Sequence, residues 1–260
     1  MSRRGSLKIM VSVWKALILR ESTVRLFGTR GAWAWLLIEP LTHFAFLTYL
    51  FAVIRQRHIG GIDITIWLIL GLFGFFTFRR TANQMGGALD SNRALFTYRQ
   101  VLPFDTIIVR GLLEGLIMLA ALTVVGFSLW LFGLDIVPDD PLLTLASLFG
   151  LWLLGAALGL VIAVLGEVAA ESRQVLNIMM MPLYFISGVI IPLTIIPPQY
   201  QPLLLFNPIV HGVEAARQGF SSFYHTADGI SLGYLYLFAT ACLWLGLLLY
   251  RRFEKLVMTQ

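Results

Sequence analysis

The sequence predicts an all-α membrane protein with six transmembrane helices, an N-terminal amphipathic interface helix, and short re-entrant helices between spans five and six. Two observations predict this class. Hydrophobic residues make up 58% of the 260 residues and charged residues only 13%, whereas a soluble domain carries about 25% charged residues. Apolar runs of about 20 residues, enough for a helix to cross a bilayer, also recur along the chain.

Residues 1–30 are predicted to form an interface segment, because residues 7–28 have an amphipathic pattern. A helical wheel puts Lys8, Ser12, Lys15 and Ser22 on one side, and mostly apolar residues on the other: Leu7, Met10, Val13, Trp14, Leu17 and Val24. A basic amphipathic helix with a tryptophan lies in the membrane surface with its apolar face down. We expect no signal peptide, since basic residues interrupt this segment.

Residues 31–255 are predicted to form the transmembrane domain, followed by a tail at 256–260. The six predicted spans are Trp33–Ile54, Ile64–Asn83, Thr106–Gly133, Leu142–Leu165, Val175–Ile196 and Ile230–Tyr250. Sixteen of the nineteen Lys and Arg residues then lie on the side that holds both termini. The positive-inside rule therefore predicts that both termini are cytoplasmic and that residues 197–229 face outward.

The outward segment after span five has an unusual composition. It has four prolines between Pro197 and Pro208, and an apolar cluster at residues 203–206 that is too short to span. Irregular backbone exposed to lipid would leave its N–H and C=O groups without partners. We predict a re-entrant lid at one end of a pathway. An interfacial loop without a role is the alternative.

Polar and aromatic residues occupy costly positions in span one. A charge at mid-membrane costs roughly 3 kcal/mol, so Glu39 and His43, one turn apart, are predicted to face a polar pathway. Alternatively, Glu39 lies near the cytoplasmic end and pairs with Arg30. Trp33 and Trp35 are predicted to be an interfacial belt or a platform for sugar rings.

Two cytoplasmic loops carry features suited to a docking partner. In the first, Asp90 or Ser91 is predicted to cap a short helix, and Asp105 to cap span three. Arg110 and Glu114 have the spacing of an i,i+4 ion pair. The second loop, residues 166–174, forms a compact polar turn. Both loops are also explained as simple connectors.

Several kinds of chemistry are not predicted. The sequence has no Gly-Lys pair, and therefore no phosphate-binding P-loop, and no H-E-x-x-H zinc pattern. Its single cysteine, Cys242, lies in an apolar run and cannot build a thiolate metal site. We expect no enzyme site, no metal and no cofactor in this chain.

Four segments resemble one known family: GAWAWLLIEP (31–40), ALFTYRQVLPFDTIIVRGLLE (94–114), PLYFISGVIIP (182–192) and NPIVHGVEAARQG (207–219). In this order, with six spans, they are similar to the permease subunit of bacterial ABC-type capsule polysaccharide exporters. The resemblance implies an inner-membrane homodimer with a channel at its interface. Two separate ATP-binding subunits, which hold ATP and Mg²⁺, would power it. The implied substrate is a lipid-linked acidic polysaccharide, passed on to periplasmic and outer-membrane proteins.

The resemblance also implies that residues 91–98 and 167–173 contact the ATPase, and that residues 199–220 form the re-entrant helices. An anionic chain needs cationic and aromatic contacts that are individually weak and spread out. The predicted substrate path comprises Arg30, Trp33, Trp35, Glu39, His43, Arg93, Tyr98, Arg99, Arg110, Tyr184 and Phe185. The predicted periplasmic exit comprises Tyr200, Asn207, His211, Glu214 and Arg217. The predicted coupling residues are Ser91, Leu95, Phe96, Glu167, Glu171 and Ser172.

Two alternatives remain open at this point. One is an ABC exporter permease for another substrate, such as O-antigen, teichoic acid or a small molecule. The other is a membrane glycosyltransferase, which would need a nucleotide-sugar and metal site. Asp90 and Asp105 in the cytoplasmic loops do not form a clustered pair for that purpose.

Overall fold

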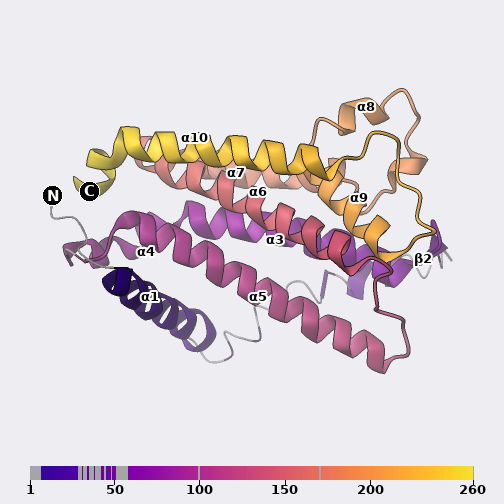
Figure 1. The fold of residues 1–260 in the computed structure, drawn as a ribbon, viewed down its shortest axis with the longest axis horizontal. Coiled ribbons are helices and arrows are strands. Elements are labelled where there is room, and N and C mark those ends of the chain that lie inside the picture. Colours follow the sequence, from indigo (N-terminus) through magenta and orange to yellow (C-terminus); the bar gives the residue numbers. More distant parts are fainter. Residues whose placement is uncertain are drawn as a thin grey trace.

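In the computed structural model, long helices run side by side along one axis, with short elements at both ends (Figure 1). The structure describes residues 7–28, 31, 34, 38, 42–43, 45–47, 49–50, 58–98, 100–169 and 171–259. Within these residues, four helices are long and apolar enough to cross a membrane. They are α3 (Ile64–Gly86), α5 (Pro103–Leu131), α6 (Pro141–Val168) and α10 (Leu232–Thr259).

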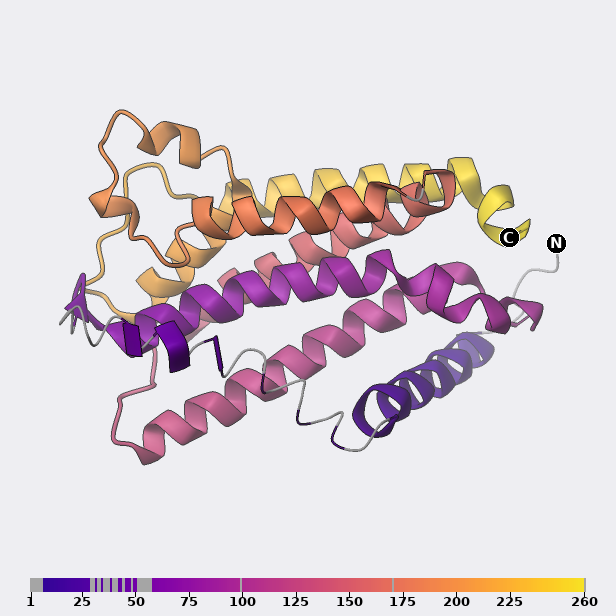
Figure 2. The same ribbon diagram turned by 180° about the vertical axis from the view of Figure 1, so that it is seen from behind.

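Shorter elements lie at the two ends of the bundle. We call the end where α1 (Leu7–Phe27) begins and α10 finishes the proximal end; it also holds α4 (Ala88–Asn92) and η1 (Arg93–Thr97). The opposite, distal end holds a two-stranded hairpin of β1 (His58–Ile59) and β2 (Ile62–Asp63). It also holds η2 (Leu193–Ile195), α8 (Gln201–Leu204) and α9 (Pro208–Phe220), in the view of Figure 2.

Helix α3 is the central helix of the bundle. Of the 18 most apolar consecutive residues of α3, 78% are buried, whereas in the corresponding stretch of α10 only 17% are buried. Helix α6 approaches α3 closely because Gly155 and Gly159 lack side chains. A Cβ at Gly155 would lie 2.5 Å from the Phe78 carbonyl oxygen, and one at Gly159 would lie 3.0 Å from the Ala82 carbonyl oxygen. This small-xxx-small spacing allows two membrane helices to pack backbone against backbone.

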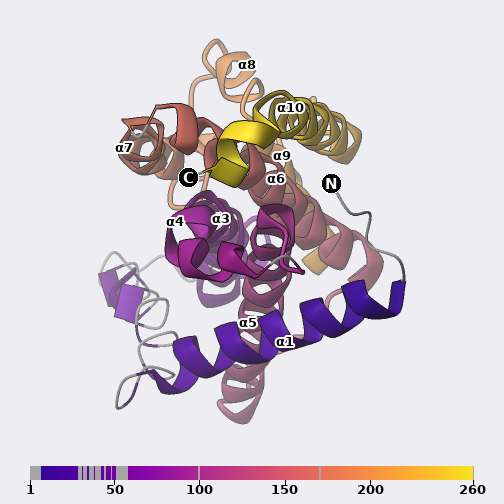
Figure 3. The same cartoon turned by 90° about the vertical axis from the view of Figure 1, so that its left-hand side faces the viewer.

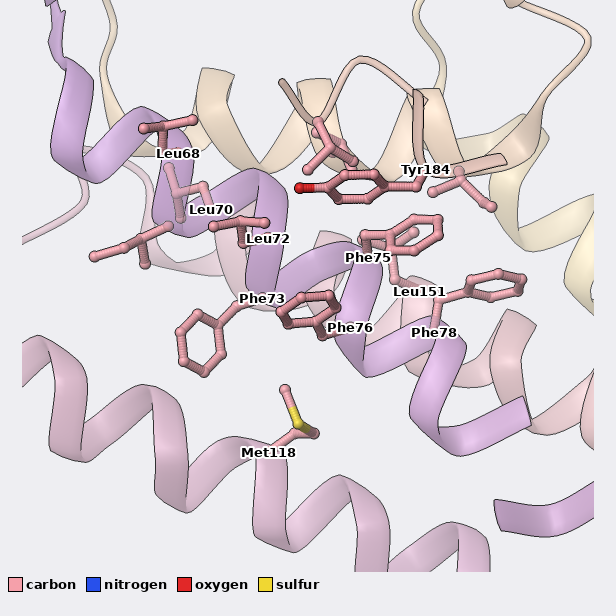
Figure 4. Close-up of a cluster of buried hydrophobic side chains, with 14 of the residues drawn as sticks. Leu68, Leu70, Leu72, Phe73, Phe75, Phe76, Phe78, Met118, Leu151 and Tyr184 are labelled. Carbon is pink, nitrogen blue, oxygen red and sulfur yellow. The ribbon is translucent and has the colours of Figure 1, made fainter. Parts of the chain in front are cut away.

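The core around α3 is rich in aromatic side chains. Figure 4 shows Phe73, Phe75, Phe76 and Phe78 projecting from α3 toward the neighbouring helices. Met118 of α5, Leu151 of α6 and Tyr184 of helix α7 (Glu171–Ile186) complete the same buried cluster. Contacts from three other helices therefore hold α3 in place.

The predicted spans two, three, four and six correspond to α3, α5, α6 and α10, although α10 continues past Tyr250 to Thr259. The prediction for span five is wrong in its bounds: α7 ends at Ile186, not Ile196. Gly188 has a φ of +69°, which ends a right-handed helix. Span one, Trp33–Ile54, lies mainly outside the described residues, and its full extent stays a prediction.

The hairpin before α3 was not predicted. Gly60 and Gly61 have φ values of +56° and +86°, as a two-residue hairpin turn requires. Its strands pair His58 with Asp63 and Ile59 with Ile62. A Cβ at Gly60 would lie 2.7 Å from a ring carbon of Tyr224, so this glycine lets the Tyr224 ring pack against the turn.

Candidate functional site

Helix α1 lies across the proximal end, in front of α5 in the view of Figure 3. Its buried Val13 and Leu17 pack against Val109 of α5. The Trp14 indole N–H donates to Asp105 Oδ1 at 2.8 Å. The prediction that the apolar face of α1 points into the membrane is therefore wrong for these residues, because α5 covers them.

Asp105 also holds the first turn of α5. Its Oδ2 accepts a bond from the backbone N–H of Leu102 at 3.1 Å. Pro103, which has no N–H to satisfy, is the first residue of the helix. Asp105 thus stabilises the start of α5, as predicted, but from inside the first turn.

A buried glutamate joins α1 to the bundle by ion pairs. The side chain of Glu114 in α5 is 0% exposed; it accepts from Arg25 Nη1 of α1 at 2.8 Å and from Arg80 Nε of α3 at 2.6 Å. Two cations from two helices thus neutralise one carboxylate, which makes its burial tolerable. The predicted pair between Arg110 and Glu114 is wrong, because Arg110 Nε binds Glu21 Oε1 at 3.2 Å instead.

Glu21 strengthens the attachment of α1. Burial alone would raise the pKa of Glu21, but Arg110, Asn92 and Arg25 together hold this pKa below its ordinary value. Burial lowers the pKa of Arg25, against the attraction of Glu114. The guanidinium stays charged because the ordinary arginine value is far above neutrality.

A second group of charges joins the two loops that were predicted to contact an ATPase. Arg93 Nη2 contacts Asp90 Oδ1 at 2.8 Å and Glu167 Oε2 at 3.1 Å. Arg173 contacts Glu167 Oε1 at 2.8 Å through Nη2, and it also pairs with Asp90. We call these four residues the loop ion-pair cluster. The Glu167 side chain is only 3% exposed, and the cluster fastens the end of α6 and the start of α7 to α4 and η1.

The other predicted coupling residues surround this cluster. Ser91 donates to the Gly87 carbonyl at 3.0 Å and accepts from Arg110 Nη1 at 3.1 Å. Leu95 packs against the contact between α1 and α5, and Phe96 packs against the apolar cluster around Leu89 and Ile107; both are partly buried. Glu171 is exposed, and the Ser172 hydroxyl donates to the Ala169 carbonyl at 2.8 Å.

The middle of the bundle brings His43 and Tyr184 together. His43 Nε2 lies 2.6 Å from the Tyr184 hydroxyl, and the His43 ring also packs edge-on against Phe76. Tyr184 is 9% exposed, whereas its neighbour Phe185 is 48% exposed. Tyr98, at the proximal end, is 65% exposed. The other predicted path residues, Arg30, Trp33, Trp35, Glu39 and Arg99, lie outside the described residues.

One face of α7 carries polar side chains that nothing in the described chain covers. Gln174, Asn177, Met181 and Phe185 follow one another at helical spacing and are all exposed. Met181 is 67% exposed. An amide on a lipid-facing surface would lack hydrogen-bond partners. This stripe therefore suits a wet pathway or another chain better than lipid.

The distal end contains a fully buried arginine, Arg217 of α9. Its guanidinium carbon lies 3.4 Å from the centroid of the Trp67 ring. Nη1 donates to the Gly188 carbonyl at 2.8 Å, Nη2 to the Val189 carbonyl at 3.0 Å, and Nε to the Trp67 carbonyl at 3.3 Å. One side chain thus ties α9 to α3 and to the turn that follows α7.

Glu214 neutralises this arginine. Its Oε1 lies 2.8 Å from Arg217 Nη1, and the Tyr224 hydroxyl donates to its Oε2 at 2.9 Å. The Trp67 indole N–H in turn donates to the Tyr224 hydroxyl at 3.3 Å. Burial, opposed by Arg217, raises the pKa of Tyr224 to about 12. We call these four residues, Trp67, Glu214, Arg217 and Tyr224, the Arg217 cluster.

The predicted exit residues therefore do not share one exposed rim. His211, Glu214 and Arg217 are at most 3% exposed, because α9 turns this face toward α3 and α6. His211 Nδ1 accepts from the Ser231 N–H at 3.0 Å, so its proton is on Nε2, which bonds the Leu205 carbonyl at 2.8 Å. Asn207 caps α9 through the Ile209 N–H. Tyr200 is 53% exposed.

Comparison with known proteins identifies the family. The family model described as ABC-2 type transporter matches residues 12–221. The chain belongs to the ABC-2 type transporter family. The matched range of this ABC-2 transporter subunit contains the loop ion-pair cluster and three of the four residues of the Arg217 cluster; Tyr224 lies just beyond it.

Curated relatives match this ABC-2 subunit over nearly its whole length. The chain is 38% identical to the polysialic acid transport protein KpsM of Escherichia coli, covering 98% of this chain and 99% of KpsM. It is 29% identical to the capsule polysaccharide export inner-membrane protein CtrC of Neisseria meningitidis serogroup A, covering 96% and 94% of the two chains. It is 28% identical to the capsule polysaccharide export inner-membrane protein BexB of Haemophilus influenzae, covering 97% of this chain and 95% of BexB.

Sequence reasoning missed several residues that organise this ABC-2 subunit. Arg25 and Arg80 entered the prediction only as topology signals, although both pair with Glu114. Trp67 and Tyr224 were not singled out. The one local sequence feature that pointed to a contact of this kind is the Gly60-Gly61 pair, because glycine often marks a place where another group approaches the backbone closely. Their partners lie up to 157 residues away in sequence, where spacing rules give no information.

Proposed function

We propose that this chain is the inner-membrane permease subunit of an ATP-driven exporter for capsular polysaccharide. The observation that carries the proposal is the end-to-end similarity to KpsM, 38% over 98% of the chain. The helices long enough to span a membrane support a multi-pass permease. Two copies form the working unit, and separate ATP-binding subunits supply the energy. The proximal end is cytoplasmic, consistent with its excess of Lys and Arg.

The conduit runs along the exposed stripe of α7 in this proposal. Gln174 and Asn177 offer amide groups to a hydrated chain, and Phe185 offers an apolar ring face. Such contacts are weak one by one, so a moving polymer does not stall on any of them. Tyr184 supports this wall from behind through its bond to His43. The polymer is an acidic, lipid-linked polysaccharide, and periplasmic and outer-membrane proteins receive it at the distal end.

The coupling surface for the ATP-binding subunits lies beside the loop ion-pair cluster. Exposed Glu171 and Tyr98 flank the cluster. Because ion pairs connect the two loops, a push on either loop moves both. Helix α7 begins at Glu171, and Arg173 in its first turn belongs to the cluster, so the cluster also fixes the start of α7.

Deletion and complementation test the proposal. A deletion strain should accumulate the polysaccharide inside the cell and lose it from the surface, and the wild-type gene should restore it. Inactivating the ATP-binding partner should give the same phenotype. Normal surface polysaccharide in the deletion strain, together with altered drug susceptibility, would instead show a small-molecule exporter.

Thiol labelling tests the conduit separately. In a Cys242→Ala background, Asn177→Cys should react with a water-soluble, membrane-impermeant maleimide added to open membrane fragments. Leu237→Cys is the matched control, since Leu237 is 69% exposed on α10, where lipid should exclude the reagent. Equal reaction rates at the two positions would remove the α7 stripe from the conduit.

A further inference from the structure

Two apolar crevices run along the flank of the bundle where α5, α6 and α3 meet. The first has a volume of about 530 Å³ and includes Phe73, Leu112, Leu116 and Trp152 in its lining. The second, about 680 Å³, extends to Trp130 and Ile136 near the distal end. They share three wall residues, Leu122, Leu145 and Leu148. The crevices therefore form one seam along the membrane-spanning part of the protein.

We infer that the first crevice holds an acyl chain of an anionic phospholipid from the leaflet at the proximal end. The polar atoms in its lining are already used within the protein. The Thr77 hydroxyl donates to the Phe73 carbonyl at 2.6 Å, and the Trp152 indole N–H donates to the Gly111 carbonyl at 3.0 Å. A polar ligand would find no hydrogen-bond partner there, whereas a hydrocarbon chain needs none.

The crevice is also open to the bilayer. Leu116, Leu119, Leu145 and Phe149 line it, and each is more than 50% exposed. The Trp152 ring is part of its wall and lies against Gly115; a Cβ at Gly115 would be 2.6 Å from the indole nitrogen. A lipid chain can therefore enter from the side without displacing a helix.

The charge at the mouth of the first crevice selects the headgroup. Ile18 of α1 belongs to its lining, and Lys15 lies one helical turn before Ile18. Lys15 is exposed, and no carboxylate in the described part of the chain lies within ion-pair distance of it. A lysine at the membrane surface attracts an anionic lipid by about 1 kcal/mol. The lipid thus bridges α1 and the bundle.

The second crevice provides an internal comparison. The loop between α5 and α6 contributes Ile136, Val137 and Pro138 to its lining, and Asp135, Asp139 and Asp140 lie in the same loop. The backbone N–H of Ser222 lowers the pKa of Asp139 below its ordinary value, so this carboxylate is ionised at neutral pH. We expect no preference for anionic lipid at this crevice.

Photo-cross-linking tests the inference. The purified full-length protein is placed in nanodiscs that contain phosphatidylglycerol or phosphatidylcholine with a diazirine in one acyl chain, and labelled peptides are mapped by mass spectrometry. Label is expected within residues 112–122 and 145–152, with phosphatidylglycerol favoured. Leu112→Trp, which fills the crevice, should remove this label. Leu237→Trp on α10 is the matched control and should not.

A separate variant tests the preference for an anionic headgroup. Lys15→Gln should reduce the ratio of phosphatidylglycerol to phosphatidylcholine label about fivefold, the value that corresponds to about 1 kcal/mol. Lys15→Arg should keep the ratio. Label spread evenly over all exposed helix faces, or unchanged by Leu112→Trp, would overturn the acyl-chain site. Equal labelling by the two lipids would overturn the anionic headgroup. The assignment of the leaflet as cytoplasmic rests on the proposed function, but the labelling does not depend on export.

Discussion

Replacing Arg217 with methionine should destabilise the distal end more than any exposed substitution. The guanidinium makes three bonds to carbonyl oxygens and one to Glu214, all between 2.8 and 3.3 Å. Methionine fills part of the same volume but leaves Glu214 buried without its cation. Removing one partner of a buried ion pair costs about 3–5 kcal/mol. At roughly 2–4 °C per kcal/mol, the apparent unfolding temperature should fall by about 6–20 °C.

The double variant Arg217→Met with Glu214→Gln separates charge from packing. No ionised group remains unpaired in this variant, and glutamine can still accept the bond from Tyr224. It should therefore be more stable than Arg217→Met alone, and the difference from additivity measures the coupling. Unfolding temperature in detergent, followed by Trp fluorescence, is the assay. Arg252→Met, at an exposed position of α10, is the control.

Two outcomes would refute this reasoning. If Arg217→Met unfolds at the parent temperature, the four bonds contribute nothing net. If the double variant is as unstable as the single one, the loss comes from shape and the Trp67 contact, not from the orphaned carboxylate.

Three further predictions concern the attachment of α1 and the loop ion-pair cluster. Glu114→Gln leaves Arg25 and Arg80 without their shared anion, so α1 should separate from α5, seen as a longer spin-label distance and faster proteolysis; an unchanged distance would contradict the ion-pair account. The pKa of Glu21 is lowered in the fold from 4.5, so its stabilising contribution is complete above about pH 4.5 and is lost as the pH falls below that value; the same distance measured against pH should increase only on the acid side, and Glu21→Gln should abolish this dependence. Glu167→Lys should uncouple ATP hydrolysis from export, and adding Arg173→Glu should restore part of the coupling; unchanged polymer-stimulated ATPase activity in Glu167→Lys would remove this residue from the coupling surface.

The four helices that are long enough to cross a membrane, α3, α5, α6 and α10, could be predicted because each is a long apolar run of distinctive length. The same reasoning misplaced the end of α7. Residues 189–191 are Val-Ile-Ile, so the hydropathy pattern predicted that the helix continues past Ser187. In the structure the helix has already ended there, and Gly188 has a positive φ. A glycine followed closely by Pro192 was the available signal, and hydropathy alone gives it no weight.

Charged residues were harder to place than apolar ones. Spacing within one helix suggested that Arg110 pairs with Glu114, and His211, Glu214 and Arg217 were predicted to lie together at the periplasmic exit. In the structure the partners of these residues come from other helices: Glu21 for Arg110, and Trp67 and Gly188 for Arg217. Within a membrane bundle a charge is stabilised by whichever opposite charge or carbonyl shares its burial. Local periodicity cannot identify that partner.

Helix α7 is held at both ends by arginines, and this arrangement gives the proposed transport cycle a mechanical element. At the proximal end Arg173, in the first turn of α7, pairs with Glu167 and Asp90. At the distal end Arg217 bonds the carbonyls of Gly188 and Val189, directly after α7. Between these two attachments the stripe from Gln174 to Phe185 is exposed. In the proposed transport cycle, α7 would carry a displacement at the loops to the turn that Arg217 of α9 holds, and the stripe would move with it. Pro182 lies inside α7 and has no backbone N–H to donate to the preceding turn, so in the proposed cycle bending at that residue would limit how much of the displacement reaches the distal end.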